Sequence, residues 1–126
     1  MKIAALVARI LLGLMFSVFG LNGFLHFLKA PPPPGLAGQF VEAMVTSNFA
    51  YLVFGVQLIA GVLLLVNRFV PFALVLLAAE LANILAFHLA MLPAGIAPGL
   101  VAIVLWLLVA SQHKAALLGL FDKPQS

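Results

Sequence analysis

The residues best suited to chemistry lie in one apolar stretch, residues 71–92, which reads PFALVLLAAELANILAFHLAML and carries Glu80, Asn83 and His88. The stretch is long enough to cross a bilayer, where a charged group near the centre is unfavourable by about 2.5–3.5 kcal/mol. At about 100° per residue, Asn83 lies about 60° to one side of Glu80 and His88 about 80° to the other. The three polar side chains therefore share one broad face, which we expect to be buried or to line a wet cavity.

Burial determines the chemistry expected of Glu80. A carboxyl group among apolar helices is favoured in its neutral form and needs a hydrogen-bond partner. We therefore expect Glu80 to be protonated at neutral pH and to form a hydrogen bond with Gln57 or Asn83. A functional and a purely structural role for Glu80 both stay open, because polar side chains in membrane bundles often only join helices, at about 0.6–2 kcal/mol per contact.

The composition excludes several classes of protein. Hydrophobic residues make up 66% of the 126 residues and charged residues 7%, whereas soluble domains are about half apolar and about a quarter charged. The chain is therefore an integral membrane protein with no room for a soluble catalytic domain, and an enzyme acting alone is the least favoured class. Its few basic residues do not suit nucleic-acid binding. The absence of cysteine excludes thiol redox chemistry, Fe–S ligation and thiolate zinc sites.

We predict an all-α fold, with residues 1–126 forming a single integral membrane domain built as a four-transmembrane-helix bundle. The expected spans are about 4–28, 49–66, 71–92 and 95–110. The run from Pro31 to Pro34 ends the first span, because proline lacks the N–H group that a helix interior needs. The sequence LAGQFVEAMVTSNF that follows predicts a short amphipathic helix in the outer loop between the first two spans.

Basic residues predict the orientation in the membrane. Lys29 stands alone on one side, and the other side carries Lys2, Arg9, Arg68, Lys114 and Lys123. Because Lys and Arg are enriched in cytoplasmic loops, we expect a multi-pass protein of the cell inner membrane with both termini cytoplasmic. Within the first span, Gly13, Ser17 and Gly20 form a small-residue stripe that favours close helix packing, either in the bundle or in an oligomer interface.

Polar side chains from three spans concentrate in the predicted outer half of the bilayer. They are Asn22, His26, Tyr51, Gln57, Glu80, Asn83 and His88. Depths counted from the span midpoints put Gln57 and Glu80 near the centre and His26 furthest out. We predict that these residues line an outward-opening ligand pocket, with the amphipathic segment as a lid that brings Glu42 near. No metal site is predicted, because no pair of His or carboxylate residues has a recognised ligand spacing.

Several ordered motifs resemble the DoxX family of small four-helix membrane proteins: GLNGFLHF, GVLLLVNRFVP, NILAFH and MLPAGIAPG. The resemblance covers residues 9 to about 121. It implies a bundle with both termini inside and a link to redox complexes, because the family is named for a subunit associated with quinol oxidation. Animal relatives resemble helpers of membrane-protein assembly. Members often carry Glu where this chain has Gln57, and no acid where it has Glu80, which predicts that positions 57 and 80 are in contact.

The resulting hypothesis is a membrane subunit or accessory protein of a redox-linked membrane complex. Its pocket would hold a quinone or lipid, with His88 and Asn83 binding the ring oxygens and Glu80 as proton donor. A small-solute or proton-coupled carrier and a purely structural assembly partner are the alternatives; a carrier is disfavoured by the apolar inner half and the lack of an inverted repeat. The expected partners are the lipid bilayer, a membrane-protein or redox-complex subunit and further copies of the chain.

Overall fold

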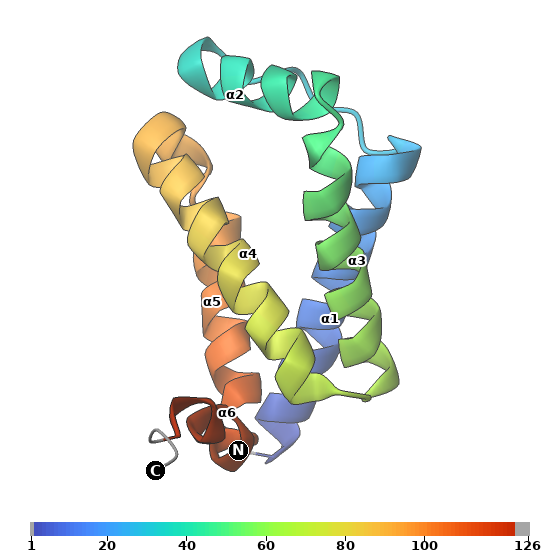
Figure 1. The fold of residues 1–126 in the computed structure, drawn as a ribbon, viewed down its shortest axis with the longest axis vertical. Helices are drawn as coiled ribbons and strands as arrows, with labels where there is room; N and C mark the ends of the chain where they lie inside the picture. Colours follow the sequence, from blue (N-terminus) through green and yellow to red (C-terminus); the bar gives the residue numbers. More distant parts are fainter. Residues whose placement is uncertain (1, 123–126) are drawn as a thin grey trace.

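A computed structural model describes residues 2–122 of the chain, and Figure 1 shows its fold. Six α-helices follow one another: α1 (Lys2–Leu25), α2 (Gly35–Thr46), α3 (Phe49–Val66), α4 (Val70–Met91), α5 (Ala97–Ala110) and α6 (Lys114–Leu118). Two short 3-10 helices are η1 (Pro93–Gly95) and η2 (Gly119–Phe121). Residues 2–122 contain no strand, which confirms the predicted all-α class for this part of the chain.

Three helices in the described range, α1, α3 and α4, are long and apolar enough to cross a membrane. Helix α5 has 14 residues, which gives about 21 Å at 1.5 Å per residue and falls short of a hydrocarbon core of about 30 Å. Together with α6 and η2 it forms a fourth candidate, bent by 99° at the break. Residues 2–122 therefore contain three or four helices that could span a membrane.

The long helices run between two distinct ends of the bundle (Figure 1). The start of α1, the turn between α3 and α4, and helix α6 lie at one end, which we call the terminal end. Helix α2 lies across the other end, beside the η1 turn that joins α4 to α5. The segments at the terminal end carry the basic residues Lys2, Arg68 and Lys114, whereas Lys29 follows α1 at the α2 end. Lys123 lies outside the described residues.

Helices α1 and α3 pack with their backbones in contact. A Cβ atom added at Gly20 would lie 2.6 Å from the Leu58 nitrogen, and one added at Gly61 would lie 2.5 Å from the Ser17 nitrogen. Because only glycine lacks a Cβ atom, these positions permit an approach that other residues would block. The predicted small-residue stripe of α1 is therefore its contact surface with α3.

The buried core fills the bundle between α1, α3, α4 and α5. Its largest fully buried side chains are Leu12, Leu64, Leu74, Leu77 and Val109. Trp106 of α5 donates a hydrogen bond from Nε1 to the Leu74 oxygen of α4 at 2.8 Å. Toward the α2 end, α3 and α4 diverge (Figure 1), and the site described next lies in this part of the bundle.

Candidate functional site

Gln57 of α3 and Glu80 of α4 form a hydrogen bond across the bundle. Gln57 Nε2 donates to Glu80 Oε2 at 3.2 Å, and the two side chains are only 6% and 8% exposed. The predicted contact between positions 57 and 80 is confirmed. Asn83, the other expected partner of Glu80, instead donates from Nδ2 to the Ala79 oxygen of its own helix at 3.0 Å.

Two cavities share a wall, which we call the shared wall, formed by Phe54 and Gln57 of α3 and by Ile84 and His88 of α4. The larger cavity has a volume of about 310 Å³ and extends to α1, η1 and α5 through Met15, Phe16, Phe19, Gly95, Pro98, Gly99 and Ala102. The smaller cavity, of about 160 Å³, extends to α2 and is completed by Phe40, Val41, Met44, Val53, Asn83 and Phe87. Gln57 and His88 are the polar side chains that line both cavities.

His88 presents one ring nitrogen to its own helix. Its Nδ1 atom lies 2.8 Å from the Ile84 oxygen. A backbone carbonyl can only accept a hydrogen bond, so Nδ1 carries the hydrogen, and in the neutral imidazole Nε2 is then an acceptor. A Cβ atom added at Gly95 would lie 3.3 Å from Nε2. The missing side chain at Gly95 therefore leaves room at this acceptor.

Gln57 has further hydrogen-bonding capacity at the shared wall. One N–H of its amide donates to Glu80, which leaves the second N–H and the carbonyl oxygen Oε1. Apart from Gln57, His88 and Asn83, the side chains that line the two cavities are apolar. A mostly apolar chamber with a few placed polar groups is the usual composition of a small-molecule site.

Most of the residues that build this site lie in the part of the chain that matches a known protein family. A family model for DoxX matches residues 4–90, which is more than half of the 126 residues. The chain belongs to the DoxX family. The match includes Gln57, Glu80 and His88 and ends before η1 and α5, which complete the larger cavity. No curated protein and no solved structure matches the chain.

In this DoxX protein, four of the predicted site residues lie together: Gln57, Glu80, Asn83 and His88. Glu80 is absent from the residues that line the two cavities and reaches the site through Gln57. Asn83 lines the smaller cavity only. Their assignment as ligand-binding residues stays a prediction.

The other three predicted residues, Asn22, His26 and Tyr51, line neither cavity. Asn22 Oδ1 accepts a hydrogen bond from the Leu28 nitrogen at 2.6 Å. His26 has a φ of 54° and donates its backbone N–H to the Asn22 oxygen at 2.8 Å. These contacts satisfy backbone groups at the C-terminal end of α1. Tyr51 is half-exposed and stacks on Phe24, with ring centroids 5.4 Å apart.

The predicted lid contributes apolar side chains rather than its acidic residue. Phe40, Val41 and Met44 of α2 line the smaller cavity, whereas Glu42 is exposed and lines neither cavity. Phe40 also packs against Phe87 of α4, with ring centroids 5.4 Å apart. Helix α2 therefore forms one apolar wall of the smaller cavity.

Sequence reasoning missed the apolar walls of both cavities. It followed polar residues, and nothing in the pattern of Phe and Ile within a span separates a cavity wall from a lipid-facing surface. The glycines opposite the shared wall were the sequence feature that could have indicated the cavities. A Cβ atom added at Gly99 would lie 3.3 Å from Ile84 Cγ2, and Gly95 faces His88.

Proposed function

We propose that this DoxX protein is an accessory subunit of a redox-linked membrane complex that binds a quinol in the larger cavity. In this proposal it spans a cell inner membrane four times, with both termini cytoplasmic and α2 at the outer surface. The observation that carries the proposal is the shared wall, where Gln57 and His88 place hydrogen-bonding groups against otherwise apolar cavities.

The hydrogen-bonding capacity of the wall favours the reduced form of a quinone. A quinol hydroxyl can donate to His88 Nε2 or to Gln57 Oε1, whereas a quinone oxygen can only accept and finds one donor in the wall, the second N–H of Gln57. Gln57, held by Glu80, takes the place proposed earlier for Asn83, which lines only the smaller cavity. Glu80 is then a positioning residue for Gln57 rather than a direct proton donor.

The size of the larger cavity suits a ring. Its volume of about 310 Å³ lies at the lower end of the range of about 300–1,000 Å³ for small-molecule sites. A substituted quinol ring therefore needs most of this space, and its tail would remain in the lipid. A phospholipid chain is the competing occupant, because the walls are mostly apolar.

A carrier is less well supported than an accessory subunit. Leu12, Leu64, Leu74 and Leu77 are completely buried in the core, and no polar side chain lines a continuous route past them in the cavities described. A structural assembly partner remains the second candidate. It requires no ligand, and the seam between α1 and α3 would be its essential feature.

Binding of a short-tailed quinol to the full chain in lipid nanodiscs tests the proposal. The matched pair is His88→Asn in the shared wall and His26→Asn outside both cavities. Loss of the His88 hydrogen bond should weaken binding about tenfold, because about 1.4 kcal/mol corresponds to that factor. His26→Asn should leave binding unchanged. Ala102→Phe, which fills the larger cavity, should abolish it.

Two results would rule out quinol as the ligand. One is the absence of saturable binding to the wild-type protein, and the other is equal weakening by His88→Asn and His26→Asn. If phospholipid alone is retained and every variant still co-purifies with the same membrane complex, the assembly-partner function replaces the redox function.

A further inference from the structure

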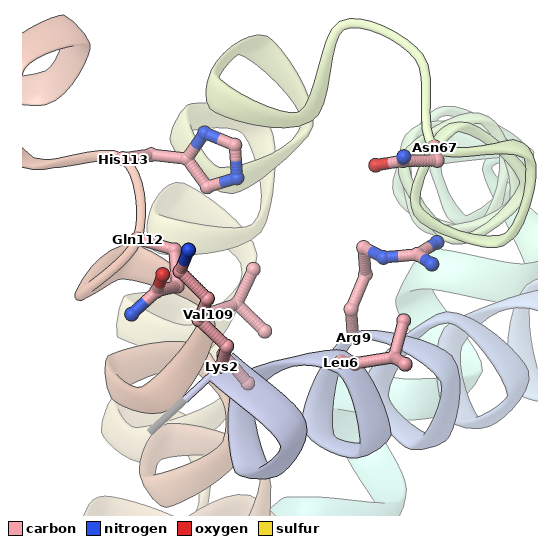
Figure 2. Close-up of a pocket in the computed structure, with 8 residues that line it drawn as sticks. Lys2, Leu6, Arg9, Asn67, Val109, Gln112 and His113 are labelled. Atoms are coloured by element: carbon pink, nitrogen blue, oxygen red, sulfur yellow. The ribbon is translucent and has the colours of Figure 1, made fainter.

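A separate cavity with basic walls, drawn in Figure 2, lies at the terminal end of the bundle, away from the two cavities described above. Its volume is about 110 Å³, and three segments line it. The lining residues are Lys2, Ala5, Leu6 and Arg9 from α1, Asn67 from the turn after α3, and Val109, Gln112 and His113 from the end of α5 and the residues after it. We call it the basic cavity, because two of these side chains are cationic and none is acidic.

Arg9 is held in place at this cavity. Its guanidinium group donates a hydrogen bond to the Leu64 oxygen near the C-terminal end of α3. Figure 2 shows the guanidinium reaching toward Asn67, with Gln112 and His113 on the other side of the opening. An arginine has five N–H donors in a planar fork, so donors remain for a bound group.

No acidic side chain lines the basic cavity to neutralise its positive charge. Lys2 and Arg9 contribute two positive charges, and the amides of Asn67 and Gln112 add neutral N–H donors. The whole chain contains three acidic residues, Glu42 in α2, Glu80 within α4 and Asp122 after η2, and none of them lines this cavity. An anion is therefore the ligand class that the walls favour.

The basic cavity lies at one end of the candidate spans, where lipid headgroups are expected. Asn67 lies in the turn between two candidate spans, and Gln112 and His113 lie where α5 has ended. Helix α1 has 24 residues, a length of about 36 Å, so its ends reach beyond a hydrocarbon core of about 30 Å. Anionic lipids attract basic residues at this level.

We propose that the basic cavity binds a phosphate group, supplied by an anionic phospholipid headgroup or by free phosphate. Arg9 would hold two phosphate oxygens through its planar fork, and Lys2 would supply a second charge. The volume of about 110 Å³ is well below the range of about 300–1,000 Å³ for larger small-molecule ligands. It is large enough for a phosphate group but too small to enclose a whole nucleotide.

Thermal unfolding of the detergent-purified full chain tests the site. Phosphatidylglycerol, phosphatidylcholine and inorganic phosphate are each titrated at constant ionic strength. Lys2→Gln and Arg9→Gln remove a charge from the cavity; Arg68→Gln and Lys114→Gln are the controls, because they remove the same charge from nearby residues that do not line it. The half-maximal phosphatidylglycerol concentration should rise about tenfold or more in the cavity variants and stay unchanged in the controls.

The three titrations distinguish the source of the phosphate. Stabilisation by phosphatidylglycerol alone assigns a lipid headgroup, and stabilisation by inorganic phosphate as well assigns the phosphate group itself. Equal losses in Arg68→Gln and Arg9→Gln, or stabilisation by phosphatidylcholine to the same extent, would overturn the proposal.

Two further variants separate binding from folding. Arg9 also bonds the Leu64 oxygen, so Arg9→Gln can unfold the protein; Lys2→Gln, which removes no such bond, then decides the result. His88→Asn should leave phosphatidylglycerol stabilisation unchanged, which separates this site from the quinol site.

Discussion

The two sides of α3 differ in how closely a neighbouring helix packs against them. On the side of α1, backbones touch at Gly20 and Gly61, where a Cβ atom would come within 2.6 Å of a backbone nitrogen. On the side of α4, the helices diverge toward α2 (Figure 1). Two cavities lie against Phe54 and Gln57 on this side. One surface of α3 therefore holds the bundle together, and the other leaves space for a ligand.

The difference shows how a small membrane protein can keep a cavity without a large core. Lipid is as apolar as a buried leucine, so helix association depends on close packing and on polar contacts. Here the close packing joins α1 to α3, and one side-chain hydrogen bond joins Gln57 to Glu80 beside the cavities. The α4 side of α3 should therefore tolerate change better than the α1 side.

The largest expected effect is on the α1 side. Gly61→Ala puts a Cβ atom 2.5 Å from the Ser17 nitrogen, which is backbone and cannot rotate away. We expect a loss at or above the upper end of the range of about 1–3 kcal/mol for overpacking. Reversible unfolding in mixed micelles measures it. A variant as stable as the wild type would show that α1 and α3 do not touch here.

The second effect tests the bond on the α4 side. Gln57→Leu leaves the buried Glu80 carboxyl without its partner, and Glu80→Leu leaves the Gln57 amide unpaired, so each should lower stability by about 1–3 kcal/mol. The double variant Gln57→Leu/Glu80→Leu leaves neither group unpaired and should be more stable than the sum of the single losses predicts. Strictly additive losses in this cycle would mean that the hydrogen bond contributes nothing.

The sequence predicted the helical fold and limited the hydrogen-bond partner of Glu80 to Gln57 or Asn83, because both predictions follow from strong physical constraints. Apolar runs of about 20 residues have few alternatives to a membrane helix. A carboxyl in such a run must find a partner, and Gln57 lies at a similar predicted depth to Glu80. The resemblance to the DoxX family predicted a contact between the same two positions.

The composition of the site was harder to predict, because it depends on where helices end and diverge. Helix α1 ends at Leu25, within the expected span. The Asn22 side chain therefore accepts from the Leu28 N–H just beyond the helix, and the His26 N–H donates to the Asn22 backbone oxygen, instead of either residue lining a cavity. The cavity walls come from η1 and α5 as well as from the first three long helices. No periodicity in a single helix contains that information.

A third, smaller effect is expected at the contact between α4 and α5. Trp106→Phe removes the hydrogen bond from Nε1 to the Leu74 oxygen while keeping an aromatic ring. We expect a loss of about 0.5–1.5 kcal/mol, measured by the same unfolding assay. Quinol binding should be retained, because Trp106 does not line the larger cavity. Loss of binding in a folded variant would show that the orientation of α5 controls the site.

The smallest effect is expected at Gly55, the other glycine of α3, which makes no close contact with a neighbouring helix. A Cβ atom added there meets Phe24 Cζ at 3.8 Å, an ordinary van der Waals distance. Because alanine is more favourable than glycine in a helix by up to about 1 kcal/mol, Gly55→Ala should leave stability unchanged or raise it. This variant is also the matched control for Gly61→Ala. A loss as large as that of Gly61→Ala would mean that another surface, such as a second copy of the chain, packs against α3 at Gly55.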